Sequence, residues 1–204
     1  MWIRGYLFLL VGAYVQIATA LPLVNIKTVV PDIMVDLKYA TADNFLHQVL
    51  YPFTTGYLHP IAANALKAAN HLLRAKKPDW VLKIWDAYRP VQVQKMMWQQ
   101  LPDTRYVANP ANGGSHQRGF TVDVTLYDTK KKCNVPMPTG FDEFSPRAAA
   151  SATHNIPPQA LANRALLQEV MTAAGFEILR TEWWHFNYKG WREQPVLDLD
   201  VARL

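Results

Sequence analysis

Two short stretches of the chain carry side chains that could do chemistry together. The first contains His116 and, seven residues later, Asp123; the second contains Glu182 and, three residues later, His185. Two imidazoles and one carboxylate suit a catalytic zinc ion, which takes three protein ligands and keeps a fourth position open for water. A glutamate beside such a site could accept a proton from that water. The sequence therefore predicts a zinc hydrolase with one Zn²⁺ per chain.

Each of these residues has a simpler interpretation when it is taken alone. His116 could be a solvated loop histidine, Asp123 could form a salt bridge or cap a turn, and Glu182 could lie on the surface. Asp123, however, lies within an apolar stretch, where a buried carboxylate is costly unless a partner or cation compensates it. Gly119 would also allow the backbone to approach closely. The combined pattern favours a metal site.

The second stretch needs a distorted backbone to contribute two groups to one site. Residues three apart on a regular strand point to opposite faces of the sheet. Glu182 and His185 can therefore face the same site only if a bend or bulge lies between them, at Trp183 and Trp184. The two tryptophans could wall such a site, or could simply belong to the core.

Periodic patterns predict the elements that must position these residues. Helical spacing of apolar residues predicts helices over 60–77, 91–101 and 159–174; Pro60 and Pro90 mark the starts of the first two, and Gly175 marks the end of the third. Alternating patterns predict strands over 80–88, 120–127, 176–180 and 184–188, and a further strand ending near residues 37–39. Irregular loops are expected at 41–59 and 136–151. This mixture predicts an α+β domain, a small antiparallel sheet flanked by helices.

The bulk properties exclude several classes of protein. A chain of 204 residues, half of them hydrophobic, can bury a core in a single domain and is not disordered. The net charge of +5 is modest and the longest basic run is Lys130–Lys132, so a nucleic-acid partner is not expected. The one cysteine, Cys133, cannot form a disulfide within the chain.

The N-terminus has the organisation of a secretory signal peptide. A basic start at residues 1–4 precedes a short apolar run at residues 6–15 and a small-x-small site at residues 18–20. The run is short for a membrane span, although an uncleaved anchor is the alternative. We therefore expect a signal peptide at 1–20 and an exported catalytic domain at 21–204, periplasmic or otherwise extracytoplasmic. Stable membrane insertion is not expected once the signal is removed.

The two stretches together resemble the zinc D-alanyl-D-alanine dipeptidases of the vancomycin-resistance type, within the wider DD-peptidase and hedgehog-like fold. That family's signature is S-x-H-x-x-G-x-A-x-D followed far downstream by E-x-x-H. The matching residues here are His116, Gly119, Asp123, Glu182 and His185. The likeness extends to residues 37–40, 44–45, 85–90 and 139–142, and so covers essentially the whole mature chain.

The resemblance implies further roles, besides zinc ligation by the two histidines and Asp123 and general-base catalysis by Glu182. Arg89 would stabilise the oxyanion of the tetrahedral intermediate, and Asp86, three residues earlier, would orient its guanidinium. Asp142 would bind the free amino group of a D-alanyl-D-alanine substrate. Tyr39 and Ser115 would contact that substrate.

The sequence departs from the signature at two positions and leaves two other functions open. Gly114 stands where the family has serine, so Ser115 would have to supply the hydroxyl contact. Thr121 stands where the family has alanine. One alternative is a zinc carboxypeptidase or endopeptidase of the same fold that cuts peptidoglycan stem peptides. The other is a non-catalytic zinc-binding module that recognises a wall fragment, although such a module would need neither Glu182 nor Arg89.

Overall fold

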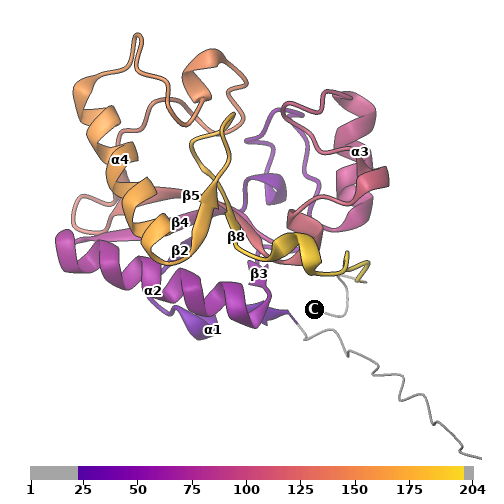
Figure 1. Ribbon diagram of the computed structural model, residues 1–204, viewed down its shortest axis with the longest axis horizontal. Helices are drawn as coiled ribbons and strands as arrows, with labels where there is room; N and C mark the ends of the chain where they lie inside the picture. The colour runs from indigo at the N-terminus through magenta and orange to yellow at the C-terminus, as the bar shows by residue number, and fades with distance from the viewer. Residues whose placement is uncertain (1–22, 200–204) are drawn as a thin grey trace, which may run out of the picture.

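The computed structural model describes residues 23–199 (Figure 1). The predicted signal peptide at 1–20 lies outside these residues. No helix in the described part of the chain combines the length and the apolar character needed to cross a membrane.

The sheet that carries the site is mainly antiparallel and has strand order β2-β4-β5-β8-β7, with β6 paired to the end of β5. Its strands are β2 (Met34–Val35), β4 (Trp80–Asp86), β5 (Thr121–Asp128), β6 (Cys133–Asn134), β7 (Phe176–Ile178) and β8 (His185–Tyr188). A separate antiparallel pair joins β1 (Val24–Asn25) to β3 (Tyr57–Leu58). The long strands β4 and β5 lie at the centre of the sheet, and β5 is also bonded to β8.

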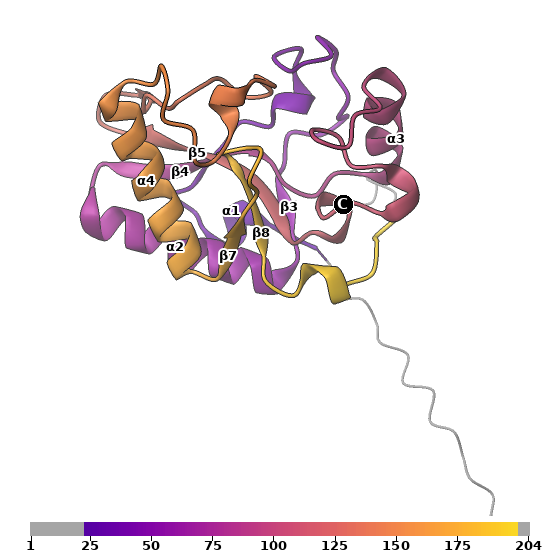
Figure 2. The ribbon, with the colours of Figure 1, turned by 45° about the horizontal axis from the view of Figure 1, so that its top comes forward.

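Within residues 23–199, four α-helices and five short 3-10 helices surround the strands. The α-helices are α1 (Ile26–Val29), α2 (Pro60–Lys76), α3 (Val91–Gln100) and α4 (Pro158–Ala173). The 3-10 helices are η1 (Lys38–Ala40), η2 (Pro110–Asn112), η3 (His116–Arg118), η4 (Pro146–Ala148) and η5 (Trp191–Glu193). Helices α2 and α4 pack against each other and against the sheet, whereas α3 lies at the far side of the molecule beside η2 (Figures 1 and 2).

The local sequence explains where the main helices begin and end. Pro60 occupies the first turn of α2, and the His59 side chain accepts a hydrogen bond from the Ile61 backbone N–H. Helix α4 ends at Ala173, and Gly175 follows it with a φ of +93°, a left-handed conformation that suits glycine. The predicted α+β class and the three long helices are confirmed, with boundaries within about two residues.

Strand β5 differs from an ordinary antiparallel strand because both of its faces are buried. Val122, Val124 and Leu126 are fully buried in the hydrophobic core. Thr121, Asp123 and Thr125, on the opposite face, are also at most 3% exposed. The polar face of this strand is therefore enclosed by protein and not solvated, which is the setting in which a carboxylate needs a specific partner.

The predicted organisation of residues 23–40 was wrong in detail. The strand β2 is only two residues long, and the strand end predicted near residues 37–39 falls instead at the start of the 3-10 helix η1 (Lys38–Ala40). The short helix α1 was not predicted. Strand β2 also pairs parallel to β4, with Met34 opposite Lys83, whereas the other strand pairs in the described part of this sheet are antiparallel. The loop predicted over 41–59 likewise contains β3, whose pairing with β1 is set by tertiary contacts.

Candidate metal centre and substrate pocket

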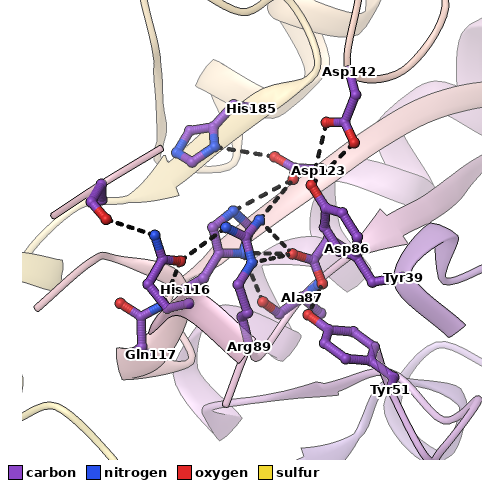
Figure 3. A network of polar contacts seen from close by, with 12 residues as sticks. Tyr39, Tyr51, Asp86, Ala87, Arg89, His116, Gln117, Asp123, Asp142 and His185 are labelled. Carbon is purple, nitrogen blue, oxygen red and sulfur yellow. Dashed lines mark hydrogen bonds and ion pairs between the residues drawn. The ribbon is translucent and has the colours of Figure 1, made fainter. Parts of the chain in front are cut away.

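The three predicted ligands converge at the junction of β5 and β8. His116 opens η3, Asp123 is the third residue of β5, and His185 is the first residue of β8. One ligand atom from each lies within 4.8 Å of the others, and all three side chains are buried. Asp123 lies between the histidines, with Oδ2 3.4 Å from His116 Nε2 and Oδ1 3.0 Å from His185 Nδ1 (Figure 3).

The chain brings His116 to the strand by a tight turn. Gly119 ends η3 with a φ of +70°, and its carbonyl accepts a hydrogen bond from the His59 N–H at 2.8 Å. A Cβ at position 119 would lie 3.1 Å from that same nitrogen, so glycine is needed for both its conformation and its size. The His116 ring is oriented by a 2.7 Å contact from Nδ1 to the Ala87 carbonyl, which leaves Nε2 for the site.

The predicted bend before β8 is present. Trp183 and Trp184 form a bend before the strand begins at His185, and both indoles are at most 1% exposed. The Trp183 indole N–H donates to Thr139 Oγ1 at 2.8 Å, which anchors the bend. As a result Glu182 Oε2 lies 3.7 Å from His185 Nδ1, on the same side as the ligands.

Arg89 is held rigidly beside this cluster. Its Nε and Nη2 both donate to Asp86 Oδ2, at 2.9 and 2.7 Å, and its Nη1 donates to Gln94 Oε1 at 2.9 Å. Asp86 is fully buried and also accepts a 2.6 Å hydrogen bond from the Tyr51 hydroxyl (Figure 3). A guanidinium has five N–H donors, so two remain for a bound molecule.

Asp142 faces the cluster from the loop over 136–145. The Tyr39 hydroxyl donates to its carboxylate, at 3.2 Å from each oxygen, and the Phe45 N–H lies 3.3 Å from Oδ2. The Arg89 guanidinium lies 5.1 Å from the centre of the Tyr39 ring. Asp142 has a φ of +55°, a conformation that aspartate and asparagine tolerate better than most residues. Asp142 is half-buried and lines the cavity.

The electrostatics of the cluster favour a bound cation. Burial and the negative charges of Asp123 and Asp142 hold the pKa of Glu182 well above its ordinary value. Burial and the charge of Asp123 raise the pKa of Asp142 to about 7. The Arg89 guanidinium is the nearby positive charge, and it is shared: its Nη2 lies 2.7 Å from Asp86 Oδ2 and 3.7 Å from Asp123 Oδ2, so one cation faces several buried carboxylates.

The donor set fits a zinc ion. Burial lowers the pKa of His185, which favours the neutral imidazole that a metal requires. His116 Nε2 is buried and has no hydrogen-bond partner within residues 23–199. Two neutral imidazoles and one carboxylate, all buried, form the ligand type and number expected of a catalytic zinc site with an open position.

The three proposed ligands line one cavity of about 350 Å³, together with Glu182, Arg89 and Asp142. That volume is at the lower end of the range for small-molecule sites, so the pocket suits a small substrate. Three loops meet over it through aromatic contacts: Phe144 lies 5.3 Å from Phe45 and stacks on Tyr106 with ring centres 4.5 Å apart. Ser115 also lines the cavity. The structure therefore brings together every site residue proposed from the sequence.

Several residues of the site were missed at the sequence level. They are Tyr51, Gln94, Gln117 and Asn187, which contact the predicted site residues or the loop that carries them. Gln117 Nε2 donates to Gln94 Oε1 at 2.9 Å, and Gln117 Oε1 accepts from the Gly114 N–H. A Cβ at Gly114 would lie 2.5 Å from that oxygen, so glycine at this position accommodates Gln117.

A buried His-Asp-His cluster, with a glutamate and a fixed arginine in one small cavity, defines the class of mononuclear metal-dependent hydrolases. Comparisons with known proteins support the assignment to a hydrolase class. Residues 19–198 match the peptidase family described as D-ala-D-ala dipeptidase. The chain belongs to that family and is a metallopeptidase.

Curated relatives extend over most of the chain. The D-alanyl-D-alanine dipeptidase of Escherichia coli K12 is 39% identical over 175 residues, which cover 86% of this chain and 89% of the relative. The D-alanyl-D-alanine dipeptidase of Streptomyces coelicolor is 33% identical and covers 80% of this chain and 88% of the relative. That of Enterococcus faecium is 31% identical, with coverages of 74% and 83%.

Proposed function

We propose that this protein hydrolyses D-alanyl-D-alanine with a zinc ion held by His116, Asp123 and His185. The observation that carries the proposal is the pairing of this cluster with a separate carboxylate, Asp142, inside one cavity of about 350 Å³. An anionic group opposite the reaction centre suits a substrate with a free amino terminus close to the scissile bond. The names of relatives that match most of the chain support the same substrate.

Each side chain of the site would have a separate role in the hydrolysis. Bound at its three ligands, zinc would acidify a water molecule and polarise the scissile carbonyl. Glu182, with its raised pKa, would accept the proton of the attacking water and deliver it to the leaving amine. The two free N–H groups of Arg89 would donate to the carbonyl oxygen as negative charge develops on it. Asp142 would bind the substrate ammonium, and the Tyr39 hydroxyl would hold the Asp142 carboxylate in place. Ser115, which lines the cavity, would contact the substrate.

We also propose that the protein is exported. The support is the basic, apolar and small-x-small pattern of residues 1–20. N-terminal sequencing of the protein recovered from the cell envelope fraction should begin at Leu21. Recovery of the intact N-terminus in the membrane fraction would indicate an uncleaved anchor instead.

The decisive test of the main proposal compares substrates and metal states. Purified residues 21–204 are incubated with D-alanyl-D-alanine or with a stem pentapeptide, with added zinc and after chelation, and amine release is measured. We expect zinc-dependent cleavage of the dipeptide and little cleavage of the pentapeptide. Preferential cleavage of the pentapeptide would identify a wall peptidase. Zinc binding without cleavage of either substrate would identify a recognition module.

A further inference from the structure

Two neighbouring cross-strand pairs occupy the face of the sheet that carries the metal ligands. Asp123 on β5 lies opposite His185 on β8, and Thr121 lies opposite Asn187. Side chains two residues apart on a strand point to the same face, so the second pair lies directly beside the first. Thr121 is fully buried and Asn187 is 8% exposed. Two polar side chains are therefore enclosed next to the proposed ligands.

The contacts connect these polar side chains to one ligand, His185. Asn187 Oδ1 lies 3.2 Å from His185 Nε2, and it also accepts a hydrogen bond from Thr121 Oγ1 at 2.7 Å. The other ring nitrogen, Nδ1, points the opposite way and lies 3.0 Å from Asp123 Oδ1. The imidazole thus presents Nδ1 to the metal cluster and Nε2 to the amide oxygen.

This arrangement selects one tautomer of His185. A histidine that ligates a metal through Nδ1 must carry its proton on Nε2, and that buried N–H needs an acceptor. Asn187 Oδ1 is such an acceptor. If the amide were turned over, its NH₂ group would face Nε2 and the ring proton would move to Nδ1, which is the ligating atom. The orientation of the Asn187 amide therefore matters for metal binding.

We propose that Asn187 and Thr121 are positioning residues for the metal centre. Asn187 accepts the Nε2 proton of His185 and keeps Nδ1 free for the metal, and the Thr121 hydroxyl, donating to the same oxygen, holds the amide in that orientation. The proposal rests on the metal site of the proposed function. The other histidine has a backbone acceptor instead, because His116 Nδ1 lies 2.7 Å from the Ala87 carbonyl, with the Asp86 carboxylate farther away at 3.5 Å.

Asn187 also lines the substrate cavity, which suggests a competing role. If it served mainly as a substrate contact, its loss would raise KM and leave the affinity for zinc unchanged. If it positions His185, its loss weakens zinc binding even in the absence of substrate. The two roles therefore separate in a measurement of zinc binding alone.

The chain offers a matched control at Thr125. Thr125 lies on the same face of β5, is 1% exposed, and its Oγ1 has no hydrogen-bond partner in the part of the chain that the structure describes. It is not among the cavity-lining residues. Thr125→Val and Thr121→Val are the same substitution in the same strand, but only the second removes a hydrogen bond to Asn187.

The experiment measures the zinc dissociation constant by competition with a chromophoric chelator, for wild type, Asn187→Leu, Asn187→Asp, Thr121→Val and Thr125→Val. We expect Asn187→Leu to weaken zinc binding about 10- to 100-fold, the usual effect of removing the acceptor of a ligating histidine. Thr121→Val should weaken it less, and Asn187→Asp, which keeps an acceptor oxygen, should retain it. Thr125→Val should match wild type.

The outcomes that overturn the proposal are distinct from those that overturn the function. Equal zinc affinity in wild type and both the Asn187→Leu and Thr121→Val proteins would exclude the positioning role. An equal loss in Thr125→Val would show that altered packing of the strand is the cause. A raised KM with unchanged zinc affinity would assign Asn187 to the substrate. Failure of the wild-type protein to bind zinc would contradict the metal site itself.

Discussion

At the scale of single residues, Glu182 lies beside the proposed metal ligands but is not one of the three residues whose ligand atoms cluster. Its carboxylate lies 3.7 Å from His185 Nδ1 and its pKa is raised by burial and by Asp123 and Asp142. We expect Glu182→Gln to lower kcat by about 10²- to 10⁴-fold, the range typical of a lost general base. The zinc content of the variant, measured by atomic absorption, should stay at one ion per chain. A near-wild-type kcat would show that another group accepts the proton.

Asp142 makes a separate prediction about pH in the metal-free protein. Its pKa is raised to about 7 by burial and by Asp123, whereas an unfolded chain has the ordinary value near 3.8. Between these pH values the folded state binds the extra proton, so this carboxyl group stabilises the fold at low pH and loses that contribution as pH rises to about 7.

We therefore expect Asp142 to stabilise the metal-free wild type more at pH 5 than at pH 8, whereas His185, whose pKa is lowered by burial, contributes in the opposite direction. In denaturant unfolding, Asp142→Asn, which tolerates the left-handed backbone, should therefore lose more stability at pH 5 than at pH 8. Glu182 contributes in the same direction as Asp142, and it does so in the variant as well. An unchanged pH dependence in the variant would mean that Asp142 is ionised at low pH in the folded protein.

The metal cluster could be proposed from the sequence, but its supporting residues could not. His116, Asp123 and His185 have ligand chemistry and recognisable spacing. Tyr51 and Gln94 reach Asp86 and Arg89 only because the loop over 41–56 and helix α3 fold back beside the end of β4. No local pattern encodes such contacts. Asn187 was within reach, since it lies two residues after His185 on the same strand face.

At the scale of elements, we expect the three loops over the cavity to limit the length of the substrate. Phe144 joins the loop that carries Phe45 to the loop that carries Tyr106, and all three rings line the cavity. Each aromatic pair contributes about 0.5–1.5 kcal/mol beyond simple burial. Loss of the central ring should therefore let the loops separate.

We expect Phe144→Ala to raise the ratio of kcat/KM for a tripeptide to kcat/KM for the dipeptide by about tenfold or more, within the range that pocket contacts supply. Steady-state kinetics on both peptides measures this ratio. Val49→Ala, an exposed substitution in the loop over 41–56, is the control and should leave the ratio unchanged. The same ratio in Phe144→Ala and wild type would mean that other contacts exclude longer peptides.

Long periodic elements were predictable, as were the short strands β7 and β8, whereas the two-residue strands of the N-terminal part were not. Helices α2, α3 and α4 and strands β4 and β5 each contain seven or more residues, enough for an apolar period to show. Strands β1, β2 and β3 have two residues each and exist through their partners. The parallel pairing of β2 with β4 likewise depends on how the N-terminal segment crosses the sheet, which tertiary packing decides.

At the scale of the whole molecule, a metal ion at the proposed site would connect η3 and β5 to β8, which lies about 60 residues later in the chain. Its proposed ligands come from η3, β5 and β8, and the carboxylates around them repel one another when no cation is bound. A ligand that binds only the folded state adds about 2.7 kcal/mol of stability at a free concentration of 100 times its dissociation constant. For a chain of this size, 1 kcal/mol corresponds to about 2–4 °C in Tm.

Zinc should therefore raise the Tm of the metal-free protein by roughly 5–11 °C at that concentration. Magnesium prefers six oxygen ligands in octahedral geometry, so it should produce little change at two imidazoles and one carboxylate. Differential scanning calorimetry of the chelator-treated protein, with each metal added back, tests both expectations. Equal shifts with the two ions would indicate weak binding to surface carboxylates, and no shift with zinc would show that the His116, Asp123 and His185 cluster does not hold it.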